Sequence, residues 1–179
     1  AASAETRIHV RQINSELGVE TGSRLRRIAD ARIETTPQNL FFTAADYEAQ
    51  GANLKASPPL RSPHDVDALR AALSAGLIDI VATDHAPHTP AEKATPCAAF
   101  ADIPGGMPGL QTLLQVMLKL VDDGLIALPD LVRLCARNPA ERFGLGRRKG
   151  KTASGYDADM LILDPRQANT IANADQVPR

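Results

Sequence analysis

The chain has 179 residues, of which 44% are hydrophobic, 23% are charged and only 3% are aromatic. These proportions are typical of a soluble globular protein with an aliphatic core. The 20 basic and 21 acidic residues give a formal net charge of -1, which argues against nucleic acid or an anionic membrane as a partner. No apolar run approaches the ~18 residues of a membrane span. Cys97 and Cys135 do not form the pattern of a disulfide scaffold, so we expect a cytoplasmic protein.

The first third of the chain predicts a strand, a helix and a second strand. Apolar and polar side chains alternate over residues 6–12, which is the pattern of a half-buried strand. Ser15 is a candidate N-cap for a helix that we expect to reach about residue 31. Residues 32–36 then predict a short strand that ends at Pro37.

The next segment carries signals for where elements begin and end. Residues 43–50 predict a short helix that starts with a Thr-x-x-Asp capping pair. Two prolines exclude helix and central strand from residues 53–61, which we expect to form an ordered loop. A serine N-cap, a proline at the first helical position and a terminal glycine predict a helix over residues 62–76. The apolar run at 77–82 predicts a strand that is covered on both faces.

Two more helices and a late strand are expected in the last part of the chain. Residues 108–124 predict a helix whose broad apolar face includes Leu110. A further helix is expected to open at Pro129 and to break at the Asn138-Pro139 pair, and residues 158–163 predict a strand. The alternation of strands and helices predicts a parallel α/β layer.

The sequence Asp84-His85-Ala86-Pro87-His88 is the most informative candidate for chemistry. It follows directly on a predicted buried strand, and the carboxyl ends of parallel strands are where α/β folds place their sites. A carboxylate at Asp84 can bind a metal and also transfer a proton. The alternative is that Asp84 caps the turn and both histidines are ordinary polar loop residues.

Other candidates have simpler interpretations. His9 on the first strand is expected to be a hydrogen-bonded structural residue, and His64 in the first turn of its helix is expected to lie on the surface. Cys97 has no identifiable base nearby and is expected to be an unactivated thiol. The glycine-rich run at 105–109 can present backbone N–H groups to an anion or a planar amide, or it can be only a turn.

Three segments together carry a family resemblance: LKASPPLR, VATDHAPHTPAEK and IPGGMPGLQT. With them, the sequence resembles the class I dihydroorotases. These are cyclic amidohydrolases, whose relatives include allantoinases and dihydropyrimidinases. The resemblance extends over most of the chain, including the strand IETTP, the helix RLCARNPAERFGL and the segment GKTASGYDADMLILDP.

The resemblance implies an α/β fold that is the C-terminal part of a metal-dependent hydrolase TIM barrel. Strands 6, 7 and 8 of the barrel, with their flanking helices, would lie within residues 1–145. Residues 146–179 would form part of a small β-sandwich domain and a C-terminal tail. Because a complete barrel needs about 250 residues, we expect a missing N-terminal half or another copy of the chain to complete the site.

The resemblance also implies roles for individual residues. Asp84 would be a metal ligand and the general acid/base, taking a proton from a zinc-activated water and returning it to the leaving ring nitrogen. His88 would contact the carboxylate or a carbonyl of the substrate, and backbone groups of Pro108 and Gly109 would hold the cyclic amide.

The sequence departs from the family pattern at several of these positions. Gln12 stands where the family has the metal-binding histidine of strand 6, and an amide is a weaker zinc ligand than imidazole. Ser57 replaces the substrate-binding asparagine of the usual NPPLR motif. The His-x-His pair, the bridging lysine and the strand 5 histidine have no counterpart. We therefore expect this chain alone to bind zinc weakly or not at all.

Two function classes follow from the resemblance. The first is a dihydroorotase-like hydrolase of pyrimidine biosynthesis, which converts dihydroorotate to N-carbamoyl-aspartate, with this chain inactive on its own. An allantoinase- or hydantoinase-type hydrolase is a variant of this hypothesis. The second is a non-catalytic dihydroorotase-like scaffold, for instance for a transcarbamoylase; Gln12 and Ser57 favour it.

Overall fold

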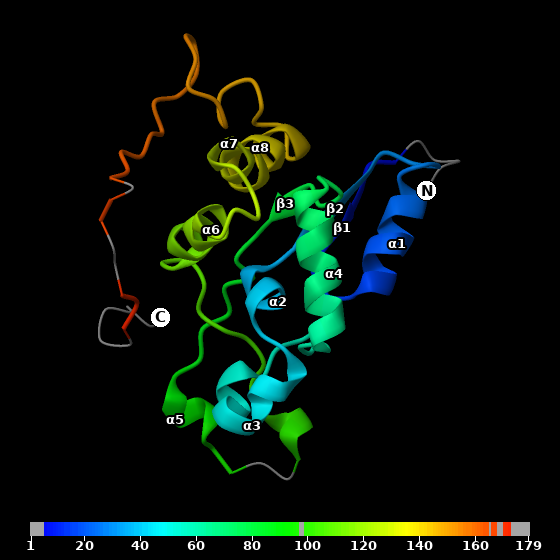
Figure 1. Cartoon of the computed structure of the whole chain (residues 1–179), viewed down its shortest axis with the longest axis vertical. Coiled ribbons are helices and arrows are strands. Elements are labelled where there is room, and N and C mark those ends of the chain that lie inside the picture. Colours follow the sequence, from blue (N-terminus) through cyan, green and yellow to red (C-terminus); the bar gives the residue numbers. More distant parts are fainter. Residues whose placement is uncertain (1–5, 97–98, 165, 168–169, 173–179) are drawn as a thin grey trace.

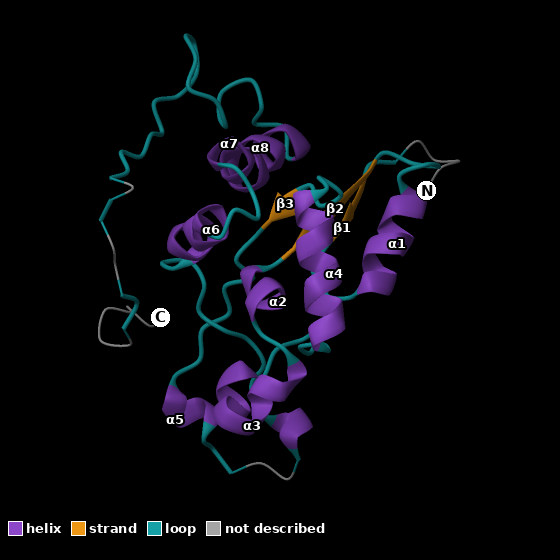
Figure 2. Ribbon diagram, viewed as in Figure 1, coloured by secondary structure: helices purple, strands orange, loops and turns teal. Residues whose placement is uncertain are grey.

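The computed structural model describes residues 6–96, 99–164, 166–167 and 170–172, and it contains a parallel three-stranded sheet. The strands are β1 (Ile8–Val10), β2 (Ala31–Thr35) and β3 (Ile80–Val81), in the order β1-β2-β3. Helices pack against the sheet, as Figure 2 shows. The prediction of a parallel α/β layer is therefore confirmed. Strands β1 and β3 are shorter than the sequence pattern indicated, whereas β2 has the predicted length and begins one residue earlier.

Helices α1 (Glu16–Leu25) and α4 (Pro63–Ser74) begin where the sequence predicted. The Ser15 hydroxyl accepts a hydrogen bond from the Gly18 N–H, and the Ser62 hydroxyl accepts one from the Asp65 N–H, each at 3.2 Å. Helix α1 ends earlier than residue 31, because β2 already pairs with β1 from Ala31 onward and the preceding residues are needed for the turn.

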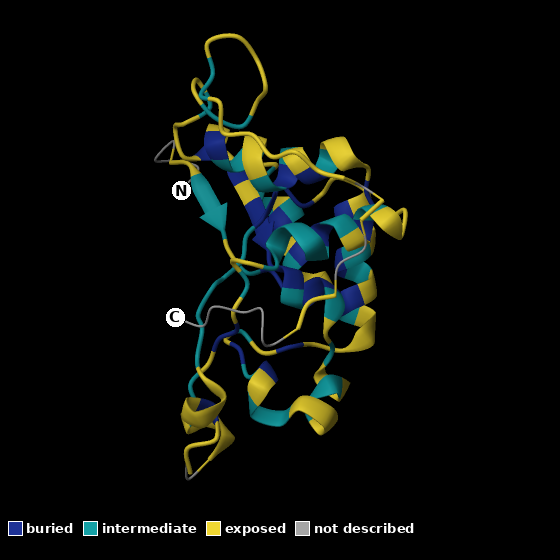
Figure 3. Ribbon diagram, turned by 90° about the vertical axis from the view of Figure 1, so that its left-hand side faces the viewer, coloured by how far each residue is buried: buried dark blue, intermediate teal, exposed yellow. Residues whose placement is uncertain are grey.

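One face of the sheet carries the hydrophobic core. Helices α1 and α4, with α2 (Pro37–Phe41), α6 (Leu113–Asp122) and α7 (Leu128–Val132), contribute to it. Figure 3 shows that the buried residues gather between the sheet and these helices. The core includes fully buried side chains from the strands and from the helices, among them Ile33, Leu40, Leu69, Met117, Leu120 and Leu134.

Helix α2 was not predicted from the sequence. Pro37 was expected only to end the second strand, but it also stands at the start of this helix, where a missing backbone N–H has no cost. Leu40 on this helix is fully buried in the core.

A second, smaller cluster lies below the sheet in Figure 1. We call this part the lower lobe: it comprises α3 (Tyr47–Gln50), α5 (Pro90–Lys93) and the 3-10 helices Ala44–Asp46, Gly51–Leu54 and Phe100–Asp102. Its apolar centre consists of Leu54, Ala56, Leu60 and Met107. The loop with the two prolines passes through this lobe, as an ordered loop should, and the Asn14 amide donates to the Pro59 carbonyl at 2.8 Å.

The segment after α7 corrects one prediction. Asn138-Pro139 does not break the helix, because a π-helical turn (Arg133–Arg137) joins α7 to α8 (Asn138–Arg142) without interruption. The Asn138 N–H bonds to the Arg133 carbonyl five residues earlier. In this turn the hydrogen bond spans five residues instead of four. The helix can therefore continue past Pro139, which has no N–H to donate.

Two further predictions are wrong. The helix expected from Pro108 begins only at Leu113, and Leu110 is 67% exposed instead of lying on an apolar face. The expected strand at 158–163 is also not formed, and Ile162 is fully exposed there. A strand needs the backbone of a neighbour, and a local apolar pattern does not supply one. Among the described residues no helix is both long and apolar enough to cross a membrane.

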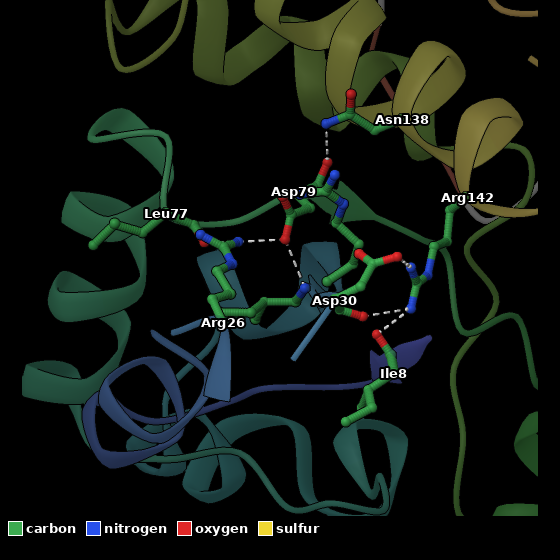
Figure 4. A network of polar contacts seen from close by, with 9 residues as sticks. Ile8, Arg26, Asp30, Leu77, Asp79, Asn138 and Arg142 are labelled. Atoms are coloured by element: carbon green, nitrogen blue, oxygen red, sulfur yellow. Dashed lines mark hydrogen bonds and ion pairs between the residues drawn. The ribbon is translucent and has the colours of Figure 1, made fainter. Parts of the chain in front are cut away.

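The amino-terminal edge of the sheet is held by buried polar side chains, which Figure 4 shows. The Arg142 guanidinium bonds to the backbone carbonyls of Ile8 and Asp30 and lies 3.2 Å from the Asp30 carboxylate. Asp79 pairs with Arg26 in the same region. Residues at this edge of a parallel sheet usually serve stability.

Candidate functional site

Two strained residues meet at the opposite, carboxyl-terminal edge of the sheet. The Gln12 side-chain amide donates to Asp84 Oδ2 at 2.6 Å. Gln12 has φ of 55° and Asp84 has φ of 47°, and they are the only non-glycine residues in the described part of the chain with positive φ. This conformation costs roughly 1–2 kcal/mol per residue. Strain of this kind concentrates at functional sites, so the geometry supports the choice of Asp84 as the central candidate.

A second carboxylate lies beside this pair, and the sequence did not single it out. Arg11 Nη2 is 3.8 Å from Asp84 Oδ1, and Arg11 Nε is 3.6 Å from Glu34 Oε1. Glu34 Oε2 also lies 2.8 Å from His9 Nε2. The side chain of Glu34 is only 7% exposed and that of His9 is 13% exposed. His9 is therefore a hydrogen-bonded structural residue, as expected. Glu34 was missed because a single glutamate within a short strand carries no local signal of burial.

His85 fixes the glycine-rich loop beside Asp84. Its Nδ1 accepts hydrogen bonds from the N–H groups of Gly109 and Leu110, at 3.1 and 3.2 Å. The Ala86 N–H donates to the Met107 carbonyl at 3.1 Å, which holds the same two segments together. Together these bonds hold residues 107–110 against the segment that follows Asp84.

The Lys93 side chain and the Lys55 backbone carbonyl hold parts of the lower lobe together. Lys93 is 5% exposed, and its ammonium donates to the carbonyls of Ala52, Asn53 and Lys55 at 3.0 to 3.2 Å. Burial, together with the nearby charge of Lys55, lowers the pKa of Lys93. The Lys55 carbonyl also accepts the Gly106 N–H at 2.8 Å, so these contacts connect the proline loop with the glycine-rich loop.

Of the other predicted site residues, Ser57 lies close to Gln12 and His88 lies farther along the chain. The Ser57 carbonyl lies 3.5 Å from Gln12 Nε2, and the residue is exposed. His88 is half-buried four residues beyond Asp84. Hydrogen bonds from Thr89, with a smaller contribution from the charge of His88, lower the pKa of Glu92. Thus Gln12, Ser57 and Asp84 come together, whereas His88 is placed next to the start of α5.

His64 lies at a distance from this centre, on the surface as predicted. It is 75% exposed and 2.9 Å from Glu16, whose hydrogen bond raises the pKa of the imidazole.

The described residues do not fit a zinc ion. No group of three or more His, Cys, Asp or Glu side chains among them is arranged to hold a metal. A catalytic zinc site needs three protein ligands, usually imidazole, thiolate or carboxylate. Here Asp84 faces an amide and a guanidinium, neither of which replaces those ligands.

The family model of the amidohydrolase family matches residues 23–177. This chain belongs to the amidohydrolase family. It is 42% identical over 139 residues to a dihydroorotase from Methanosarcina mazei, and 39% identical over 168 residues to one from Halobacterium salinarum. These alignments cover 77% and 94% of this chain but only 30% and 38% of the relatives, so the chain spans about a third of their length.

Solved structures of the same superfamily share the fold of this amidohydrolase chain. An L-hydantoinase from Arthrobacter aurescens is 32% identical with a TM-score of 0.82, and the match covers 87% of this chain and 35% of that one. A D-hydantoinase from Thermus sp. is 27% identical with a TM-score of 0.88 over 97% of this chain and 39% of that one. The resemblance to cyclic amidohydrolases is therefore confirmed, and the α/β fold matches a part of these TIM-barrel enzymes.

The buried thiol of Cys135 provides a first prediction, which concerns its reactivity. Burial raises the pKa of Cys135 to about 12. In a Cys97→Ser background, we expect Cys135 to react with a disulfide reagent about 1000-fold more slowly in the folded protein than in urea, because the thiolate is the reacting form. Absorbance of the released thiol measures both rates, and equal rates would contradict the burial. Cys97 itself lies outside the described residues.

Proposed function

We propose that this chain carries one edge of the site of a dihydroorotase-like cyclic amide hydrolase. The position of Asp84, at the end of β3 and between the proline loop and the glycine-rich loop, supports the proposal most directly. The identity of about 40% to proteins named dihydroorotase favours dihydroorotate over other cyclic amides. The reaction would be the opening of dihydroorotate to N-carbamoyl-aspartate, a step of pyrimidine biosynthesis, in the cytoplasm.

In this proposal the residues of the chain bind the ring and move a proton. The Asp84 carboxylate would accept a proton from the attacking water and return it to the ring nitrogen as the amide bond breaks. The Gly109 N–H is engaged by His85, so the Pro108 carbonyl would be the backbone group that accepts a ring N–H. His88 would bind the substrate carboxylate, and Ser57 would line the opposite side.

We further propose that residues 1–145 belong to the barrel and residues 146–179 to the small β-domain. A zinc ion in the whole protein would have to draw its ligands from outside the described residues, because those residues do not fit it.

The test is an assay of protein purified through a tag on this chain from its own cells, so that any associated polypeptide is retained. We expect it to open dihydroorotate at least 10-fold faster than allantoin or hydantoin. The Asp84→Asn variant should lose at least 100-fold in rate, as expected for loss of a general acid/base. The isolated 179 residues should show no turnover. A preference for hydantoin or allantoin would contradict the substrate assignment.

A second candidate is a non-catalytic dihydroorotase-like subunit that serves assembly, for instance with a transcarbamoylase. The 2.6 Å contact between Gln12 and Asp84 favours it, because the carboxylate is already occupied by the protein. In this case the same preparation should be inactive on all three cyclic amides and should contain a partner enzyme in a fixed ratio. The Asp84→Asn variant should then retain the partner.

A further inference from the structure

The Arg11 guanidinium lies between two carboxylates at the carboxyl-terminal edge of the sheet. Its Nη2 is 3.8 Å from Asp84 Oδ1 and its Nε is 3.6 Å from Glu34 Oε1. Arg11 directly follows β1, Glu34 lies in β2, and Asp84 follows β3. We call this group, together with Gln12, the strand-end cluster.

The two carboxylates of the cluster need a positive charge close by. Glu34 is 7% exposed and Asp84 is 25% exposed, so water screens their mutual repulsion only in part. Arg11 carries a charge at every accessible pH and offers several N–H donors in a planar fork. His9 on the other side of Glu34 adds a hydrogen bond and contributes a charge only when it is protonated.

Gln12 adds a hydrogen bond from a neutral amide to Asp84 on the other side. Its amide donates to Oδ2, whereas Arg11 faces Oδ1, so both oxygens of the carboxylate have a protein partner. A divalent cation bound to Asp84 would have to displace the amide and would face the charge of Arg11 a few ångströms away. Both changes oppose metal binding.

We propose that Arg11, assisted by Gln12, takes the place of a divalent metal ion at the strand ends of this chain. The guanidinium supplies the fixed positive charge that holds Asp84 and Glu34 together, and the cluster is therefore complete without a metal. This inference concerns the charges of the cluster and holds for either candidate function. Its readout is metal affinity, so its failure and the failure of the proposed hydrolase activity can be told apart.

The experiment is a calorimetric titration of the 179-residue chain with Zn²⁺, repeated with the Asp84→Asn variant. Because both oxygens of Asp84 already have a protein partner, the two proteins should bind zinc with the same affinity within about twofold. Any zinc bound at surface histidines or thiols is common to both and cancels in the comparison. A loss of 10-fold or more in the Asp84→Asn variant would overturn the proposal.

A second experiment removes the charge of Arg11 but keeps a long side chain at that position. Arg11→Met should bind zinc at least 10-fold more tightly than the parent chain, and adding Asp84→Asn should abolish that gain. Arg24→Met is the matched control, because Arg24 is an exposed arginine on α1, 3.8 Å from Glu20, and should leave zinc affinity unchanged. Circular dichroism verifies that each variant is folded.

A third experiment adds a metal ligand at the position of the Gln12 amide. The double variant Arg11→Met with Gln12→His should bind zinc more tightly again, since imidazole is a stronger zinc ligand than an amide. Unchanged zinc affinity in both the single and the double variant would contradict the proposal. If Arg11→Met does not fold, the comparison of the parent chain with Asp84→Asn decides the question alone.

Discussion

Replacing Asp79 with alanine is expected to lower the free energy of unfolding by about 3 kcal/mol. The Asp79 carboxylate accepts the buried Ile33 N–H at 2.7 Å and pairs with Arg26, while its own carbonyl accepts from the Asn138 amide at 2.7 Å. These contacts join the end of α1, strand β2 and the π-helical region, as Figure 4 shows. Alanine would leave the Ile33 N–H without its carboxylate acceptor. The Arg26 guanidinium would keep the Leu77 carbonyl as an acceptor but would lose the carboxylate of its ion pair. Urea denaturation measures the change.

Two variants separate the causes of this loss. Asp79→Asn retains an oxygen that can accept the Ile33 N–H but removes the charge, so we expect a smaller loss, of roughly 1–2 kcal/mol. Asp123→Asn is the surface control, because Asp123 is 33% exposed and its ion pairs lie at the end of α6, where pairs contribute about 1 kcal/mol or less. Equal losses in Asp79→Ala and Asp123→Asn would show that the network at the amino-terminal edge does not stabilise the fold.

The sequence predicted those elements whose ends are set by their own residues. Helix α4 starts at Ser62-Pro63 because the cap and the proline act within one turn, and the structure shows the expected hydrogen bond. The continuation of α7 through Pro139 was not predictable in the same way. It depends on a π-helical turn next to Asn138, and the Asn138 side chain bonds to Asp79, 59 residues away.

The candidate site was predicted in part, for a related reason. Asp84 was found because a carboxylate at the end of a buried strand is a recognisable pattern. Arg11 and Glu34 were missed because their contacts join residues far apart in the sequence, and neither has a local feature that distinguishes it from a surface charge. His85 was given no individual role within the Asp84–His88 candidate, although it accepts two backbone N–H groups from residues 24 and 25 positions later.

The two edges of the sheet thus differ in what their buried charges do. At the amino-terminal edge, Arg142 and Asp79 satisfy backbone groups of the strands themselves and hold the sheet to the helices. At the carboxyl-terminal edge, Arg11 and Asp84 face each other and leave loops free to form the rest of a site. This division is the one that parallel α/β folds generally show.

The glycine-rich loop provides the last prediction, because one of its residues has no room for a side chain. Gly106 has φ of 136°, and a Cβ there would lie 2.4 Å from the Ala86 carbonyl oxygen and 2.5 Å from the Ala86 Cβ. Gly106→Ala is therefore expected to cost roughly 3 kcal/mol of unfolding free energy, from backbone strain and from overlap with the neighbouring segment. Urea denaturation measures the loss.

The same substitution should also disturb the site in a way that a general loss of stability would not. Moving Met107 away from Ala86 would break the hydrogen bonds from Gly109 and Leu110 to His85, so the ¹⁵N chemical shift of His85 Nδ1 should change in the folded protein. Gly76→Ala is the matched control: Gly76 has φ of 71° with nothing within 4 Å, so alanine should cost only about 1 kcal/mol. An unchanged His85 resonance in Gly106→Ala would contradict the role of this glycine in placing the loop beside Asp84, because the close approach of the two segments is what directs the Gly109 N–H at the imidazole.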